Sequence, residues 1–267
     1  SVSLGSFFAF RIDSLMIPKF ISNAANGDFK LGVNLANTLM IPAAGVFALY
    51  SPLISESLKK NDLSVLKTKY ADVAKNLFFI GILLYGCVLL GMKDFFEILP
   101  TSDKLLPVLP VLYILGGNVV LNMATGFNTE IIAYSKFYRF NLIAIVVLAV
   151  LNLGLNYYIL TQTNYGIIGV AWASFFAMLV FNLTKLWFIY CKFNMLPINS
   201  NYVKTIVSSL VLLTIAFVLP LNVFGMFDFV VRCSFFAGTF MLLMYKTGWV
   251  QEFNNNVEKV MQLVLRK

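Results

Sequence analysis

The sequence predicts an all-α fold, a polytopic membrane bundle of about eight transmembrane helices. Hydrophobic residues make up 60% of the 267 residues and charged residues only 12%, about half the roughly 25% that soluble domains carry. The charges also fall in short stretches that separate long apolar runs, such as 77–92, 142–160 and 167–190. Runs of this kind approach the roughly 20 residues that a helix needs to cross about 30 Å of hydrocarbon. The function must therefore be carried out within or across a bilayer.

Eight helices are expected in order along the chain, one for each apolar run. Their predicted bounds are about 2–21, 33–54, 76–93, 106–128, 139–160, 166–190, 203–222 and 227–245. The first two contain polar residues, and Pro18, Pro42 and Pro52 should kink or end them. A membrane bundle tolerates such breaks when neighbouring helices satisfy the freed backbone groups.

The basic residues predict the orientation of the bundle. Thirteen of them follow the second, fourth, sixth and eighth predicted helices: Lys59, Lys60, Lys67, Lys69, Lys75, Lys136, Arg139, Lys192, Lys204, Lys246, Lys259, Arg266 and Lys267. The opposite side has four: Lys19, Lys30, Lys93 and Lys104. The positive-inside rule then places both chain ends in the cytoplasm. Because the net charge of +8 follows this loop pattern, it indicates a membrane protein and argues against nucleic acid as a partner.

Two stretches on the predicted cytoplasmic side are amphipathic. Apolar residues recur at helical spacing in Leu63, Leu66, Tyr70 and Val73, and again in Trp249, Phe253, Val257, Val260, Met261 and Val264. Both stretches fit helices that lie on an anionic membrane surface, with membrane lipids as partners. They fit equally well as solvated helices packed against the bundle, and the sequence leaves the choice open.

Polar residues line one face of three predicted helices. They are Ser3, Ser6 and Asp13 in the first; Asn118, Asn122, Thr125 and Thr129 in the fourth; and Asn141, Asn152 and Asn156 in the fifth, which share a face at about 100° per residue. A single asparagine is best explained as a hydrogen bond between helices. Stripes on three helices together predict a shared hydrophilic cavity.

Arg11 and Asp13 are the strongest candidates for a functional site. An ionised side chain near mid-bilayer costs about 2.5–3.5 kcal/mol, so it should face a cavity or a partner. The two residues lie about 200° apart on a helix and do not pair with each other. The alternative is a later helix start, with Arg11 at the interface. Lys185, Asp228 and Arg232 lie towards helix ends, where snorkelling explains them.

The sequence predicts neither catalysis nor a cofactor. It contains no histidine, and its three cysteines (Cys87, Cys191 and Cys233) lie far apart, so no metal-ligand spacing can be recognised. The glycine-rich phosphate loop, the nucleophile elbow and the dinucleotide fingerprint are also missing. We expect no enzyme activity, no catalytic residue, no metal and no cofactor.

Several short segments together resemble one family of exporters. They run Arg11-Ile-Asp-Ser-Leu-Met-Ile17, Gly32-Val-Asn-Leu-Ala36, Pro52-Leu-Ile-Ser-Glu56, Gly126-Phe-Asn-Thr-Glu-Ile-Ile132, Ser135-Lys-Phe-Tyr-Arg139 and Tyr165-Gly-Ile-Ile-Gly-Val-Ala171. In this order they resemble the C-terminal half of a bacterial lipid-linked oligosaccharide (O-antigen type) flippase. That family is a branch of the multidrug/oligosaccharidyl-lipid/polysaccharide exporter superfamily.

The resemblance implies an organisation and a task. Residues 1–195 would form the six-helix C-terminal lobe, and 196–267 two additional helices with an amphipathic cytoplasmic tail. The N-terminal lobe, a partner of this part, would be missing from the chain. The whole protein would move undecaprenyl-diphosphate-linked oligosaccharide across the bacterial inner membrane for polysaccharide or lipopolysaccharide biosynthesis. Arg11 would meet the diphosphate or an acidic partner, and Asp13 would take part in ion coupling.

Three other functions remain open. A cation-coupled multidrug antiporter of the same superfamily would share the fold, but its cavity should be acidic and aromatic. A membrane oligosaccharide polymerase or ligase would need a sizeable outward loop, and the predicted outward loops are short. A purely structural membrane subunit would explain neither Arg11 and Asp13 nor the aligned asparagines.

Overall fold

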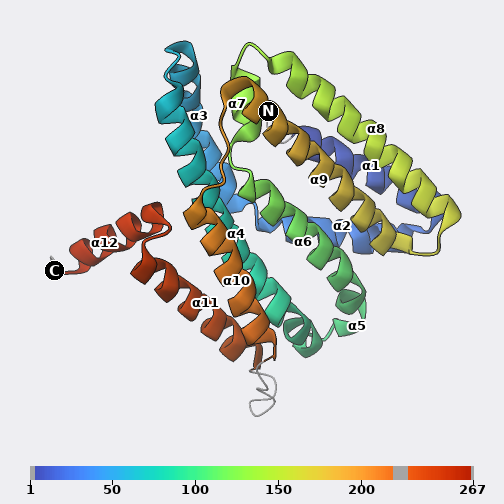
Figure 1. Cartoon of the computed structure of the whole chain (residues 1–267). Coiled ribbons are helices and arrows are strands. Elements are labelled where there is room, and N and C mark those ends of the chain that lie inside the picture. The colour runs from blue at the N-terminus through green and yellow to red at the C-terminus, as the bar shows by residue number, and fades with distance from the viewer. Residues whose placement is uncertain (1–3, 219–227, 266–267) are drawn as a thin grey trace.

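The chain is described here by a computed structural model, which covers residues 4–218 and 228–265 (Figure 1). Side chains of residues 4–11, 260 and 263–265 lie outside this description. All secondary-structure elements of the described part are helices, and it contains no strand. Its elements are α1 (Leu4–Phe20), α2 (Asn23–Thr38), α3 (Ile41–Lys59), α4 (Leu63–Ile98), α5 (Ser102–Leu105), η1 (Leu106–Val108), α6 (Leu109–Ala124), α7 (Asn128–Tyr134), α8 (Tyr138–Gln162), α9 (Gly166–Phe193), α10 (Ser200–Val218), α11 (Asp228–Thr247) and α12 (Gln251–Leu265).

The predicted all-α membrane bundle is confirmed. Within the described residues, seven helices are long and apolar enough to cross a membrane: α3, α4, the continuous segment Ser102–Ala124, α8, α9, α10 and α11. The first predicted helix corresponds to α1, whose 17 described residues extend about 25 Å. The chain is a multi-pass membrane protein.

The predicted helix 33–54 is wrong, because the chain breaks in the middle of it. Helix α2 ends at Thr38, and α3 begins at Ile41 with Pro42 in its first turn. Proline is common at this position. The backbone N–H that proline lacks would have no hydrogen-bond partner in the first turn of a helix. The sequence of α2 is polar, so hydropathy did not identify it as a separate helix. Its N-terminus is capped by the Ser22 hydroxyl, which accepts a hydrogen bond from the Ala25 N–H at 3.1 Å.

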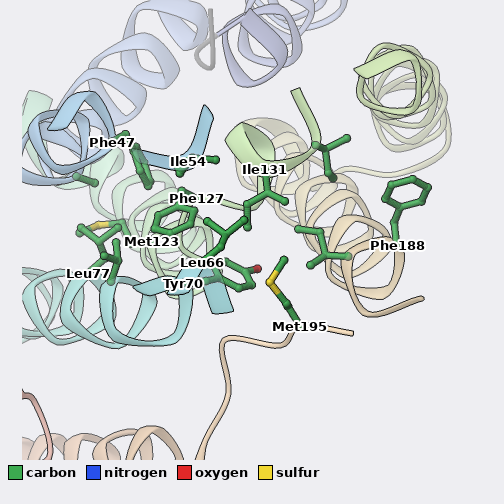
Figure 2. Packing of buried hydrophobic residues seen from close by; sticks show 14 of the residues in the cluster. Phe47, Ile54, Leu66, Tyr70, Leu77, Met123, Phe127, Ile131, Phe188 and Met195 are labelled. Carbon is green, nitrogen blue, oxygen red and sulfur yellow. The ribbon is translucent and has the colours of Figure 1, made fainter. Parts of the chain in front are cut away.

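Helix α4 is much longer than the predicted 76–93. Its 36 residues span about 54 Å, well beyond the hydrocarbon thickness. The first amphipathic stretch forms its beginning, and Leu66, Tyr70 and Val73 are fully buried. Figure 2 shows Leu66 and Tyr70 in one cluster with Phe127 and Ile131. The apolar face of this stretch therefore packs against the bundle.

The last three helices pack on α4. Glycines let α11 approach closely, since a Cβ at Gly86 would lie 2.3 Å from the Phe236 ring. The first turns of helix α12 also contact α4: the Phe253 and Phe79 rings form a tilted pair with centroids 4.8 Å apart. Further along α12, Met261 is 41% exposed. The second amphipathic stretch is thus anchored on the bundle at its start, and at least Met261 further along is exposed.

The helices form two groups joined by α6 (Figure 1). Helices α1, α8 and α9 pack together in one group, and α4, α10 and α11 in the other. Helix α6 packs against α4 on one side and against α9 on the other. The first group contains the strongest sequence candidate, Asp13.

Candidate functional site: a buried aspartate network

Asp13 lies at the centre of a polar network formed by three helices. It comes from α1, while Asn152 and Asn156 come from α8 and Ser174 comes from α9. Asn152 and Asn156 are four residues apart, the spacing that places two side chains on one face of a helix. That face packs against α1, and Ser174 closes the network from α9. Elements far apart in the sequence thus converge on one carboxylate.

Both carboxylate oxygens of Asp13 accept hydrogen bonds. Oδ1 accepts from the Asn152 Nδ2, at 2.9 Å, and from the Asn156 Nδ2. Oδ2 accepts from the Ser174 hydroxyl at 2.6 Å. The Asn152 Oδ1 is a second acceptor inside the network, 3.3 Å from the Ser174 Oγ and 3.4 Å from the Asn156 Nδ2. The four side chains therefore form one connected unit.

The network is enclosed by protein. Asp13, Asn152 and Asn156 are 0% exposed, and Ser174 is 4% exposed. Among the described side chains, Asp13 takes part in no ion pair. A buried carboxylate surrounded by neutral groups is costly while it carries its charge. A proton or a monovalent cation would remove that cost, so the arrangement suits reversible binding of one of them.

One hydrogen-bond acceptor next to Asp13 is unsatisfied among the described residues. The Asn156 Oδ1 is buried and has no hydrogen-bond partner among the described residues. Such an unsatisfied atom costs about 1–3 kcal/mol, and a bound cation or a water molecule would satisfy it. No group of three or more His, Cys, Asp or Glu side chains that could hold a metal ion occurs in the described part of the chain.

The other predicted site residues do not join this network. Asn141 is on the same face of α8 but 11 residues before Asn152, about 16 Å along the helix. Asn118 and Asn122 are on α6, where Asn118 is 3% exposed and Asn122 donates a weak 4.0 Å hydrogen bond to the Met40 sulfur. Arg11 belongs to α1, but its side chain lies outside the described residues. Of the three predicted polar stripes, those on α1 and α8 meet at Asp13. The stripe on α6 does not join the Asp13 network.

A second buried polar cluster was not predicted from the sequence. Lys185 on α9 is 1% exposed, and its ammonium donates to the Thr129 hydroxyl at 2.7 Å and lies 3.9 Å from the Phe181 ring centre. Glu130, next to Thr129 on α7, is also 1% exposed. Burial raises the pKa of Glu130 to about 7, against the opposing effect of the positive charge of Lys185. The expectation that Lys185 snorkels is therefore wrong.

The prediction for Lys185 was wrong because hydropathy does not show which helices contact each other. Helix α9 continues to Phe193, eight residues beyond Lys185, and α7 packs across it. A helical-wheel comparison would have found the signal, because Ser174, Asn182 and Lys185 fall within about 80° on α9. Asp228 and Arg232 face each other one turn apart at 3.9 Å, with side chains that are 11% and 20% exposed.

No protein-family model, curated protein or solved structure matches this chain. Its function must therefore be argued from the residues themselves.

Proposed function

We propose that this chain is part of an ion-coupled membrane transporter that moves undecaprenyl-diphosphate-linked oligosaccharide across the bacterial inner membrane. Coupling would take place at Asp13, through a proton or a monovalent cation. The sequence resemblance suggests the substrate and the membrane, and the charge distribution suggests that both ends of the chain are cytoplasmic. The seven apolar helices are consistent with such a transporter.

The observation that carries this proposal is the burial of Asp13 at a junction of three helices. Its charge is compensated by neutral donors alone within the described network. Binding or release of a positive ion would change the electrostatic free energy of the site by several kcal/mol. Such a change can shift the equilibrium between two packings of α1 against α8 and α9, as alternating access requires.

Two further asparagines support a second conformation with a wetter interior. The Oδ1 atoms of Asn118 and Asn141 are buried and lack hydrogen-bond partners among the described residues. Each leaves a penalty of about 1–3 kcal/mol in this conformation. A state in which α6 and α8 face water would remove that penalty. In the proposal these residues and Asn122 contact the glycan in that state, and Arg11 contacts the diphosphate.

A multidrug antiporter is the second candidate, and the same aspartate favours it. A buried carboxylate can bind an organic cation as well as a small ion. However, the described polar groups near Asp13 are amides and a hydroxyl, which suit sugar hydroxyls as hydrogen-bonding partners. The aromatic residues expected around an organic cation do not occur among these partners.

Transport in reconstituted vesicles distinguishes the two candidates. The protein, together with any N-terminal lobe in its natural chain, would be reconstituted with a fluorescent undecaprenyl-diphosphate oligosaccharide under an imposed proton or sodium gradient. We expect gradient-dependent movement of the lipid between leaflets, measured by protection from a membrane-impermeant quencher. Gradient-dependent efflux of a cationic dye without lipid movement would reject the flippase in favour of the antiporter.

The control variant for this assay is Asp103→Asn. Asp103 is exposed in the short helix α5, so its neutralisation should leave transport unchanged. Asp13→Asn should abolish the effect of the gradient. If both variants respond to the gradient as the unmodified protein does, coupling does not depend on Asp13.

A further inference from the structure

An apolar groove runs between α8 and α9 on the outside of the bundle. It contains a cavity of about 140 Å³, comparable to a cavity that accepts a benzene-sized apolar ligand. The lining is apolar except for one threonine at its end: Phe140, Ile143, Ala144, Val147, Leu148, Leu151, Ala177, Val180, Phe181 and Thr184. The groove therefore offers space to hydrocarbon and little to water.

The groove has a buried floor and open walls. Ala144, Leu148 and Ala177 on the floor are at most 6% exposed. On the walls, Ile143 is 62% exposed and Val147 is 54% exposed. The hollow exists because the two alanines leave space that larger side chains would fill. A chain could enter it sideways from the surrounding membrane.

One end of the groove adjoins a group of basic residues. Phe140 stacks on Phe188 at 3.8 Å between ring centres, and Phe188 contacts Phe137 edge-on at 5.5 Å. The ammonium groups of Lys136 and Lys192 lie 5.3 and 5.7 Å from the Phe137 ring centre. Arg139, in the first turn of α8 and next to Phe140 in the sequence, is also exposed.

No acidic residue balances these charges in the nearby sequence. After Glu130 the next acidic residue is Asp228, so α8 and α9 contain neither Asp nor Glu. Lysine and arginine near a membrane surface each attract an anionic lipid headgroup by about 1 kcal/mol, roughly a five-fold effect on binding. The basic end of the groove therefore favours an anion.

We propose that the groove between α8 and α9 is a binding site for one anionic phospholipid. One acyl chain lies along the floor, and the headgroup contacts Lys136, Arg139 and Lys192. The lined stretch of α8 from Phe140 to Leu151 is about 16 Å long, close to half of the roughly 30 Å hydrocarbon core. This length matches a chain that ends at mid-bilayer. A polyprenyl carrier would extend far past the groove, so the length favours a phospholipid.

Native mass spectrometry of the purified full chain tests this proposal. The protein is mixed with palmitoyl-oleoyl phosphatidylglycerol or with phosphatidylcholine that has the same chains. We expect one molecule of phosphatidylglycerol to be retained in preference to phosphatidylcholine. Replacing Lys136 and Arg139 by glutamine should reduce that preference roughly five-fold for each charge removed.

A blocked groove provides the second test. Val147→Trp fills the opening and should lower the retention of phosphatidylglycerol roughly ten-fold, as expected when about two methylenes lose their contact. Val211→Trp is the matched control, because Val211 on α10 is 51% exposed and is not part of the groove. Ile143→Trp is a second blocking variant, to be used if Val147→Trp folds poorly by circular dichroism.

Three results would overturn the site. If Val147→Trp and Val211→Trp retained phosphatidylglycerol equally, the bound lipid would lie on the general surface of the bundle and not in the groove. Equal retention of the two phospholipids by the unmodified chain would remove the role of the basic residues. Displacement of phosphatidylglycerol by an equal concentration of undecaprenyl phosphate would assign the groove to the carrier lipid. The proposal does not depend on the transport function, because lipid retention is measured without transport.

Discussion

Replacement of Asp13 by alanine and by asparagine should separate its structural role from its role in coupling. In Asp13→Ala, three hydrogen bonds to the carboxylate are lost. Ser174 and Asn156 retain a second acceptor, the Asn152 Oδ1. The bond from Asn152 to the carboxylate is lost, and Ser174 and Asn156 are left with their longer bonds to the Asn152 Oδ1. Each of these three changes costs about 0.5–1.5 kcal/mol. We expect a total loss of stability of about 1.5–4.5 kcal/mol.

The asparagine variant should cost much less. Its Oδ1 can still accept from Asn152 and Asn156, and its new N–H group can donate to the Ser174 Oγ. The Ser174 hydroxyl can then turn to the Asn152 Oδ1, which already lies 3.3 Å away. Every hydrogen bond has a replacement, so the loss should stay within about 1 kcal/mol. The negative charge is lost, and with it the binding of an ion.

The assay compares folding with transport. Thermal unfolding in detergent, followed by tryptophan fluorescence, ranks the stability of the two variants against Asp103→Asn. Gradient-dependent transport in vesicles then tests coupling. We expect a stable but uncoupled Asp13→Asn protein and an unstable Asp13→Ala protein. An asparagine variant that is as unstable as the alanine variant, or that stays fully coupled, would refute the role of the Asp13 charge in coupling.

Three other predictions concern Glu130, Lys185 and Glu252. Lys185→Met leaves Glu130 buried beside an apolar residue, and the double variant with Glu130→Gln should recover about 0.5–3 kcal/mol in a double-mutant cycle of unfolding; additive losses would show that the two side chains are independent. The pKa of Glu130 is raised from 4.5 to about 7, so its contribution to stability is greatest below pH 4.5 and falls as the pH rises to about 7. Unfolding measured across this range should lose that slope in Glu130→Gln. Lys185 and Tyr70, two titratable side chains that interact with Glu130, remain in this variant. An unchanged slope would contradict the assignment to Glu130. Glu252 accepts hydrogen bonds from the Tyr50 hydroxyl at 2.7 Å and from the Asn76 amide at 3.0 Å. Glu252→Ala should release α12 and raise its amide hydrogen exchange, at a cost of about 1–3 kcal/mol, and unchanged exchange would show that the aromatic contacts alone hold it.

The apolar runs predicted most of the helices, because burial in hydrocarbon requires length and low charge. Pro42 predicted a kink or an end near the break between Thr38 and Ile41. The separate helix α2 was missed, since its polar sequence lacks the signal that identifies a membrane helix. The extension of α4 was missed for a related reason: its first residues carry lysines between the apolar ones. Membrane hydropathy recognises lipid contact, while these segments are shaped by contact with other helices.

The candidate site was predicted in part. Helical periodicity placed Asn152 and Asn156 on one face, and the cost of a buried charge singled out Asp13. The sequence could not show that these residues meet, because residues from α1 and α8 approach through packing that no local pattern encodes. The same limitation explains Lys185, whose partner Thr129 lies 56 residues away. Asn118 and Asn122 remain site predictions that await a test in another conformation.

The unbroken length of α4 has a mechanical consequence. No proline interrupts its 36 residues, so it should behave as a stiff lever. One arm carries Leu66 and Tyr70 in the hairpin with α3, and the other carries Gly86 against Phe236 of α11. A movement that tilts the α3–α4 hairpin must therefore move α11 as well. The positions of the C-terminal helices are coupled to the rest of the bundle through α4.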